Sequence, residues 1–339
     1  MTDVRVHTAE QTIMGAVRDA ILDRSIVWSF DRSGFLRHAR RFRAEDVDVD
    51  LAGRVCLVTG ANSGIGRAAA TALARRRADV WLLCRDRARG EEAAASISRV
   101  TENRRVHIEA VDISRIASVQ AFTERFAPAR VDVLIHNAGV LPATRQETAE
   151  GLELTLATNV IGPFLLTHLL QPKLAAARDA RVIFVSSGGM YAQRLSLDDL
   201  QWTQRRFDGV TAYAQTKRMQ VVLTELLARR WSRHRIAVHA MHPGWADTPA
   251  VRSSLPRFYR LMRRRLRTPE QGADTLVWLA VAPLAVTPSG RFWFDRAPQP
   301  THLLPFTTEP PRDRARLWRT CQRLAGLTPS SGRRRRVQV

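Results

Sequence analysis

Tyr213 and Lys217 are four residues apart in a helix-forming stretch, so both side chains project from one helical face. An ammonium beside a phenol stabilises the phenolate, which predicts a lowered pKa for Tyr213. Such a tyrosine can give a proton to a carbonyl oxygen, or take one from an alcohol, as hydride moves. The alternative is that both side chains are simply exposed on the helix surface and have no catalytic function. The rarity of lysine favours a functional role for Lys217, because only Lys173 and Lys217 are lysines among 53 basic residues. The sequence suggests no role for Lys173.

Polar residues upstream of this pair can complete an acid–base site. Ser186 and Ser187 follow the apolar run 182–185, and a hydroxyl at the carboxyl end of a strand can bind a developing oxyanion. The alternative role for the serines is a cap or a turn. Asn159 is a polar amide in an otherwise apolar helical stretch, where it either holds a water molecule or bonds the carbonyl one turn back.

A glycine-rich turn, TGANSGIG at 59–66, separates the apolar run 55–58 from strong helix formers at 67–75. A strand, a glycine turn and a helix N-terminus in this order predict a pyrophosphate cradle. The turn exposes backbone N–H groups, and the helix dipole favours an anion. Glycines alone would also suit a tight structural turn, but their place between strand and helix favours a dinucleotide site.

The residue after the second apolar run bears on which dinucleotide is bound. An acidic side chain there usually holds both ribose hydroxyls of NAD, whereas this chain has Arg85, which can grip a 2′-phosphate. NADP(H) is therefore preferred, and NAD(H) stays open because Asp86 is adjacent. Asp112, after the third run, can accept from an adenine amino group or cap the next helix.

Two further turns are expected at the same edge of the sheet. HNAG at 136–139 ends the fourth run, and its small residues allow a flat cofactor ring to approach the backbone. We expect His136 to be structural there. HPGWADT at 242–248 follows the sixth run, where its backbone can contact a carboxamide and Thr248 can reach a phosphate.

Strand and helix patterns alternate along the chain, which specifies a parallel sheet. Right-handed crossovers then give an α/β, doubly wound, three-layer fold of about seven strands with helices on both faces. The expected strands are 54–59, 79–84, 105–111, 131–135, 181–186, 235–241 and 290–294, and the expected helices include 86–99, 114–127, 152–177, 211–233 and 269–282. We predict one domain at 51–297, an N-terminal helical extension at 1–50, and a C-terminal extension at 298–339 with a disordered basic tail at 333–336. Prolines 298, 300 and 305 mark the expected end of the compact fold.

The N-terminal extension has two interpretations. Apolar residues at helical spacing over 13–21, followed by Ile26-Val27-Trp28, resemble an anchor that lies on a membrane surface. We favour instead a helix packed on the outside of the domain, because the stretch is short and includes Asp19, Asp23 and Asp31.

Composition narrows the function classes. The net charge of +21 comes from arginines spread over most of the chain, so we do not favour nucleic acid as a partner. No apolar run approaches the ~20 residues that span a bilayer. The three cysteines, Cys56, Cys84 and Cys321, form no CxxC pair and indicate a reducing, cytoplasmic setting. The chemistry read from the motifs involves no metal.

Together these motifs, in this order, resemble the short-chain dehydrogenase/reductase family and its retinol-dehydrogenase-like branch over about residues 50–300. The resemblance implies a Rossmann-type fold and a catalytic tetrad of Asn159, Ser187, Tyr213 and Lys217. Tyr213 would be the acid/base, Lys217 would lower its pKa and hold the nicotinamide ribose, Ser187 would steady the substrate oxygen, and Asn159 would seat a proton-relay water. The chain departs from the family pattern in two places. His136 replaces the first Asn of the usual NNAG, and a long gap between Ser187 and Tyr213 suggests an insertion over the substrate cleft.

We therefore expect an NADP(H)-dependent oxidoreductase that interconverts an alcohol and a ketone or aldehyde. The alternative is a nucleotide-binding sensor or scaffold with little catalysis. The resemblance also implies a lid at 249–268, which is rich in arginine and would suit an apolar substrate or an amphipathic one with an acidic group, and it implies self-association. The expected cofactor contacts are Gly60, Asn62, Ser63, Gly64, Ile65, Gly66, Arg85, Asp112, Ile113, Asn137, Ala138, Gly139, Tyr213, Lys217, Pro243, Gly244 and Thr248.

Overall fold

The structure is a computed structural model that describes residues 25–283 and 288–327, together with Asp19, Leu22 and Asp23. The apolar residues expected to form a helix over 13–21, and the basic tail at 333–336, lie outside the described residues.

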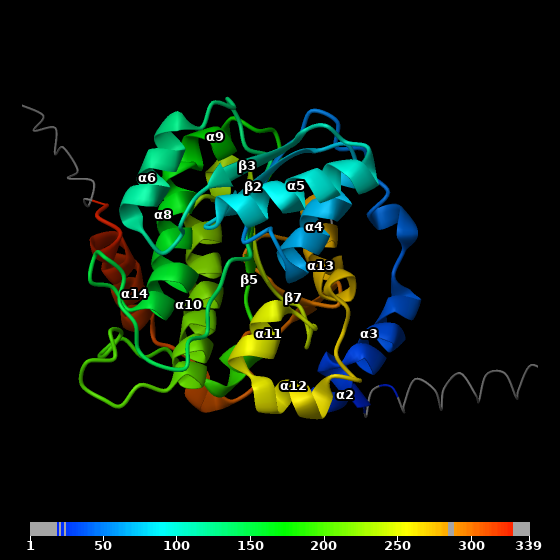
Figure 1. Ribbon diagram of the computed structural model, residues 1–339. Coiled ribbons are helices and arrows are strands. Elements are labelled where there is room, and N and C mark those ends of the chain that lie inside the picture. The colour runs from blue at the N-terminus through cyan, green and yellow to red at the C-terminus, as the bar shows by residue number, and fades with distance from the viewer. Residues whose placement is uncertain (1–18, 20–21, 24, 284–287, 328–339) are drawn as a thin grey trace, which may run out of the picture.

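One sheet of eight strands, in the order β3-β2-β1-β4-β5-β6-β7-β8, organises the described chain (Figure 1). The first seven strands are parallel, as expected, and β8 pairs antiparallel with β7. The strands are β1 (Val55–Thr59), β2 (Asp79–Cys84), β3 (Val106–Ala110), β4 (Val133–His136), β5 (Ala180–Val185), β6 (Ile236–His242), β7 (Phe292–Phe294) and β8 (Ala297–Gln299). This arrangement confirms the doubly wound α/β fold.

The eighth strand corrects the expected count of seven. Asp295 and Arg296 both have positive φ, 48° and 59°, which is the backbone of a tight hairpin turn. Such a turn usually carries Asn-Gly or Asp-Gly, so Asp-Arg gave no signal. Pro298 is tolerated in β8 because the strand lies at the edge of the sheet.

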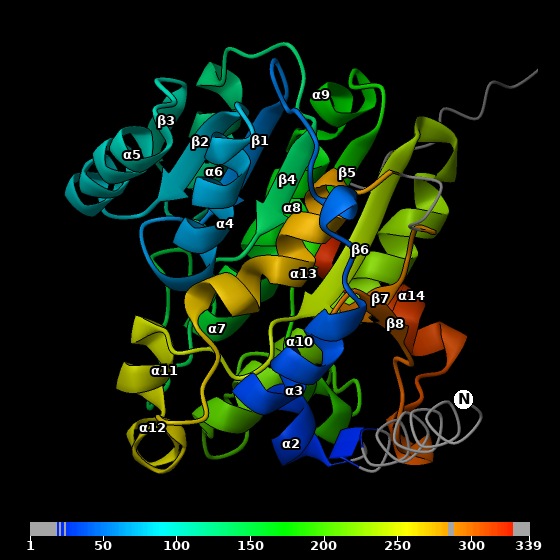
Figure 2. The same ribbon diagram turned by 90° about the vertical axis from the view of Figure 1, so that its right-hand side faces the viewer.

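Helices cover both faces of the sheet (Figure 2). One apolar core includes side chains of α4, α5 and α13, and the other includes side chains of α6, α8 and α10. The helices are α2 (Ile26–Phe30), α3 (Arg32–His38), α4 (Gly64–Arg75), α5 (Arg87–Thr101), α6 (Ile116–Arg125), α7 (Leu154–Leu156), α8 (Gly162–Leu169), α9 (Gln171–Ala175), α10 (Gly209–Arg230), α11 (Pro249–Ser254), α12 (Pro256–Met262), α13 (Pro269–Val281) and α14 (Pro311–Leu324). No helix in the described part of the chain is long and apolar enough to cross a membrane.

We expected the compact fold to end near Pro298, but it continues through α14. Helix α14 packs against α10, and its residues Leu317, Trp318 and Cys321 are buried in the core. Arg230 of α10 lies 4.0 Å from the centroid of the Trp318 ring. Eight of the fourteen α14 residues are charged or polar, and only a narrow apolar stripe faces the core, so the sequence beside the prolines did not indicate a packed helix.

Candidate active site

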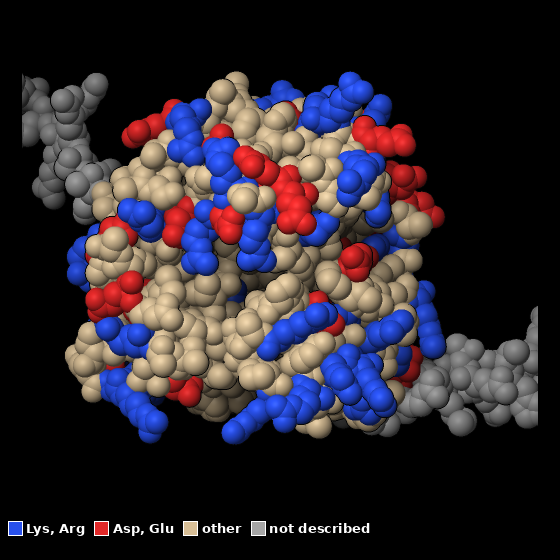
Figure 3. Space-filling model, viewed as in Figure 1, with Lys and Arg blue, Asp and Glu red and all other residues tan. Residues whose placement is uncertain are grey.

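A cavity of about 530 Å³ lies at the carboxyl ends of the central strands and brings most of the expected site residues together. Figure 3 shows the hollow at the centre of one face of the molecule. Its lining includes Gly60, Asn62, Ser63, Gly64, Ile65, Arg85, Asp112, Ile113, Asn137, Ala138, Gly139, Ser187, Tyr213, Lys217, Pro243, Gly244 and Thr248. Two expected residues, Gly66 and Asn159, are not part of the lining and lie behind it.

The glycine turn has the form of an anion cradle. Gly60 and Gly64 have φ of 64° and 55°, which favours glycine at both positions. Ser63 begins α4 without a side-chain capping bond, and no acidic residue occupies the first turn of the helix. The backbone N–H groups of this turn therefore suit a phosphate, as does the positive end of the helix dipole.

Asn137 holds this cradle from behind. Its Nδ2 donates to the carbonyl oxygens of Thr59 and Gly60 at 3.0 and 3.1 Å, and its backbone N–H donates to Thr59 Oγ1 at 3.0 Å. A Cβ on Gly66 would lie 2.4 Å from the same Nδ2, so Gly66 serves close packing. The turn, its clamp and the open helix N-terminus together fit a dinucleotide pyrophosphate.

The two residues after β2 have different environments. Arg85 is exposed and lines the cavity. Asp86 is not among the lining residues, because its carboxylate caps α5 by accepting from the N–H of Arg89. Asp112 lines the cavity without being a helix cap, since its Oδ1 accepts from the N–H and the hydroxyl of Ser114 and α6 begins after Arg115.

Ser187, rather than Ser186, is associated with Tyr213. Ser186 is buried, and its hydroxyl donates to the Lys217 carbonyl at 2.9 Å, which is a structural role. The Ser187 side chain lies next to the Tyr213 phenol, close enough to influence its pKa. Burial raises the pKa of Tyr213 to about 12, and the neighbouring Ser187 side chain opposes the rise only in part.

The lowered pKa expected for Tyr213 is therefore wrong for this structure. The Lys217 Nζ lies 5.1 Å from the centroid of the Tyr213 ring and donates to the Val185 carbonyl and to Gln220 Oε1. Burial lowers the pKa of Lys217 itself to about 7. Lys173, the other lysine, donates to the carbonyls of Phe126 and Pro128, so it has a structural role that the sequence did not reveal.

Asn159 connects two parts of the site. It lies in a π-helical turn, Ala157–Ile161, a distortion that often occurs at functional sites. Its Oδ1 accepts from the N–H of Val140, and its Nδ2 donates to Thr216 Oγ1, beside Tyr213. The side chain thus joins the loop after β4 to helix α10.

Sequence reasoning missed Gln220. This buried side chain accepts from Lys217 Nζ at 3.2 Å and donates through Nε2 to the Asn159 carbonyl at 2.7 Å. The backbone carbonyl of Asn159 is therefore bonded by a side-chain amide of α10. One turn of helix separates Gln220 from Thr216 and Lys217, and this polar face of α10 was the available signal.

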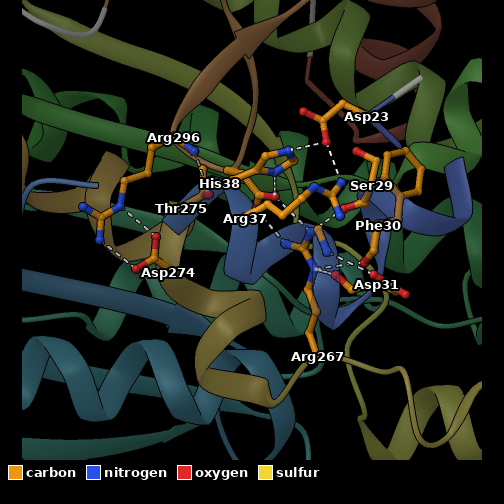
Figure 4. A network of polar contacts seen from close by, with 12 residues as sticks. Asp23, Ser29, Phe30, Asp31, Arg37, His38, Arg267, Asp274, Thr275 and Arg296 are labelled. Atoms are coloured by element: carbon orange, nitrogen blue, oxygen red, sulfur yellow. Dashed lines mark hydrogen bonds and ion pairs between the residues drawn. The ribbon is translucent and has the colours of Figure 1, made fainter. Parts of the chain in front are cut away.

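The turn after β6 rests on a buried arginine. A Cβ on Gly244, whose φ is 72°, would lie 2.3 Å from Arg267 Nε. The Arg267 guanidinium donates to both oxygens of Asp295 and to the backbone carbonyls of Ser29, Phe30 and Asp31 (Figure 4).

The N-terminal extension contacts the back of the site, as its expected packing on the domain implies. Phe30 accepts a backbone hydrogen bond from Trp245, and its ring lies 4.3 Å from the His242 ring. His242 Nδ1 in turn accepts from the N–H of Gly188, the residue after Ser187. His136 is structural, as expected, because its Nε2 pairs with Thr167 and burial lowers its pKa to about 3.

The lid expected at 249–268 covers part of the cavity. It contributes Pro249, Ala250, Val251, Ser254, Leu255 and Phe258 to the lining and none of its arginines, so its contacts are mainly apolar. The long segment between Ser187 and Tyr213 does not cover the cleft, because only Gly189 and Val210 of it line the cavity. Its middle packs elsewhere through Gln201, which bonds Glu153 and Gly151.

Comparisons with known proteins agree with this geometry. The family model described as short chain dehydrogenase matches residues 54–257. Dehydrogenase/reductase SDR family member 12 of Bos taurus is 45% identical over 316 residues, covering 90% of this chain and 98% of that protein. Retinol dehydrogenase 12 of Bos taurus is 38% identical over 263 residues, covering 76% and 83%. The crystal structure of a 3-ketoacyl-(acyl-carrier-protein) reductase from Brucella melitensis, complexed with NADH, superposes with a TM-score of 0.57 at 28% identity, covering 72% and 96%.

Proposed function

The chain belongs to the short-chain dehydrogenase family and is an NAD(P)-dependent oxidoreductase, and from this premise we propose that it uses NADP(H) to interconvert an alcohol and a ketone or aldehyde. The observation that carries the proposal is the juxtaposition of the Ser187–Tyr213 pair with the phosphate cradle in one cavity.

The preference for NADP(H) rests on Arg85 and Asp86. Arg85 is exposed at the cavity, where its planar guanidinium suits the 2′-phosphate. Asp86 is the carboxylate that would otherwise hold the ribose hydroxyls, but it is engaged as the cap of α5. A 2′-phosphate would therefore meet a cation at Arg85, and the ribose diol of NAD would meet a carboxylate that already accepts from the N–H of Arg89.

Each residue of the proposed catalytic tetrad has a separate role in the reaction. When bound, the nicotinamide supplies or accepts the hydride. Tyr213 holds its proton at neutral pH, as any phenol with a pKa of 10 or above does, so it can protonate a carbonyl oxygen. Ser187, next to the phenol, orients the same oxygen. Alcohol oxidation reverses the proton transfer.

Lys217 and Asn159 act one step further from the substrate. Lys217 Nζ lies 3.6 Å from the position of a Cβ on Gly139, so it is beside the HNAG turn expected to receive the cofactor ring, where it would hold the nicotinamide ribose. Asn159 fixes the loop after β4 against α10. The lid supplies apolar contacts, which favours an apolar substrate.

We also propose a cytoplasmic setting, because Cys56, Cys84 and Cys321 are free and buried.

Titration of the purified chain with NADPH and NADH, followed by nicotinamide fluorescence, tests the cofactor proposal. We expect NADPH to bind at least about tenfold more tightly, which is the effect of one charge-assisted contact. Equal affinities would contradict the preference, and failure to bind either cofactor would contradict the proposed function.

A further inference from the structure

Large apolar side chains are exposed at one end of the molecule. Leu261 on α12 is 81% exposed, and Ile26 and Trp28 on α2 are 57% and 39% exposed. Helices α2 and α12 lie near each other at the lower end of the molecule in both Figure 1 and Figure 2. Scattered apolar residues are ordinary on a protein surface, but grouped ones indicate a surface that meets a partner.

Contacts between the two segments make this a single surface. The N–H of Arg32 donates to the Arg265 carbonyl at 2.8 Å, which ties α3 to the chain that follows α12. The Arg265 guanidinium lies 4.3 Å from the centroid of the Trp28 ring. Trp28 is thus held beside a cation while much of its ring stays exposed.

The same surface is strongly basic. Residues 250–267 contain seven arginines and no acidic residue. Two of the seven are neutralised, Arg252 by Asp247 and Arg267 by Asp295. Arg257, Arg260, Arg263 and Arg264 are exposed and form no ion pair with any residue that the structure describes.

The basic cluster differs from the rest of the surface. Figure 3 shows Lys and Arg side chains gathered below the hollow, whereas acidic and basic side chains alternate above it. Arg87 on α5, for example, pairs with Glu91. The surface formed by α2, α12 and the residues after α12 therefore differs from the rest of the molecule, because its arginines are unpaired and surround exposed Leu and Trp side chains.

We propose that this surface, formed by Ile26, Val27, Trp28, Arg257, Arg260, Leu261, Arg263 and Arg264, docks on an anionic lipid bilayer. Arginines are attracted to the headgroups, Trp is suited to the interface, and Leu261 enters the acyl boundary. A polyanion such as RNA would engage the arginines but would leave Leu261 and Ile26 in water. Along α12 the exposed Arg257, Arg260 and Leu261 follow helical spacing, whereas Phe258 lines the cavity. The same short helix therefore contributes to the proposed docking surface and to the cavity.

Vesicle sedimentation with the full-length chain tests this proposal. The vesicles are phosphatidylcholine alone, or phosphatidylcholine mixed with phosphatidylserine. We expect binding to the mixed vesicles and little to phosphatidylcholine alone. Arg260→Gln with Arg264→Gln should weaken the binding about 30-fold, from the loss of two cations near the surface. Leu261→Glu should weaken it by at least about tenfold.

Matched controls lie on α5 and in the segment that follows it, at the opposite end of the molecule. Arg99→Gln with Arg104→Gln removes the same charge, and Val100→Glu replaces a side chain that is 56% exposed. These controls should bind like the wild type, and unchanged thermal unfolding should show that all variants are folded. The proposal is overturned if the patch variants bind as well as the controls, which would assign any binding to other basic segments such as 333–336. It is also overturned if the chain binds RNA through these arginines but no vesicle.

Discussion

The Lys217 ammonium lies 5.1 Å from the centroid of the Tyr213 ring, yet it donates to the Val185 carbonyl and to Gln220. Helical spacing puts the two side chains on one face, but the hydrogen-bond acceptors behind the helix decide where the charge lies. The pair is therefore an acid with a raised pKa beside a base with a lowered one.

The lowered pKa of Lys217 predicts a pH-dependent stability. Between about 7, its pKa in the folded chain, and 10.5, its ordinary value, the unfolded chain binds a proton that the folded chain does not. The contribution of Lys217 to the free energy of unfolding should therefore rise with pH, by up to about 1.4 kcal/mol per unit. Denaturant unfolding of wild type and Lys217→Met at several pH values measures this difference. A difference that stays constant from pH 7 to about 9 would contradict the lowered pKa.

Gln220 should matter for both stability and turnover. Gln220→Leu leaves the buried Asn159 carbonyl and one Lys217 contact without a partner, so we expect a loss of about 1–3 kcal/mol in the free energy of unfolding. We expect turnover to fall more than cofactor affinity, because the change acts on Lys217 and Asn159. Gln215→Leu is the control on the same helix, since Gln215 contacts Arg205 instead. Equal turnover in the two variants would remove Gln220 from the site.

Arg85 should discriminate between the cofactors. Arg85→Gln removes the cation proposed for the 2′-phosphate, so NADPH binding should weaken about 10- to 100-fold while NADH binding stays the same. Arg87→Gln is the control, because Arg87 is directed to Glu91 and does not line the cavity. Parallel losses for both cofactors in Arg85→Gln would instead indicate a general structural role.

His38 should stabilise the N-terminal extension in its protonated form. Its ring lies 2.6 Å from Asp295 and 2.9 Å from Asp23, with Arg267 and Arg37 bonded to the same carboxylates. Burial opposes the charged form, but the two carboxylates prevail and raise the pKa of His38 above its ordinary 6.5. Its contribution is therefore complete below pH 6.5 and is lost as the pH rises through the higher folded value.

The variant His38→Gln tests this contribution in thermal unfolding. The variant should be less stable than the wild type in acid, and the gap should narrow as the pH rises. The exposed His234 supplies the control through His234→Gln, which should change nothing. A gap independent of pH would show that His38 acts by packing alone.

Much of the fold and of the site followed from local signals. The glycine turn, the alternating strands and helices and the Tyr213–Lys217 spacing each depend on neighbours in sequence, and the cavity brings those residues together. The contacts that were missed join distant segments. Gln220 reaches Asn159 across 61 positions, and Arg267 reaches Phe30 across 237. No periodicity encodes such pairs, because they depend on how the elements pack.

The pKa of Tyr213 illustrates the same limit. Spacing alone gave a charge beside the phenol and hence a lowered pKa. Burial of the ring and the carbonyl of Val185 reverse that expectation, and both are properties of the packed structure. The edge strand β8 was missed for a related reason, since its three residues are specified by pairing with β7.

The central claim is that Tyr213 is the acid/base of an NADP(H)-dependent reaction. The most direct measurement compares wild type with Tyr213→Phe for NADPH oxidation in the presence of aliphatic and aromatic aldehydes, alongside NADPH binding. Tyr191→Phe is the control, because the Tyr191 hydroxyl donates to the Pro300 carbonyl and does not line the cavity. We predict a loss of about 10²- to 10⁴-fold in turnover for Tyr213→Phe, with NADPH affinity retained and the control active. Undiminished turnover in Tyr213→Phe would contradict the account.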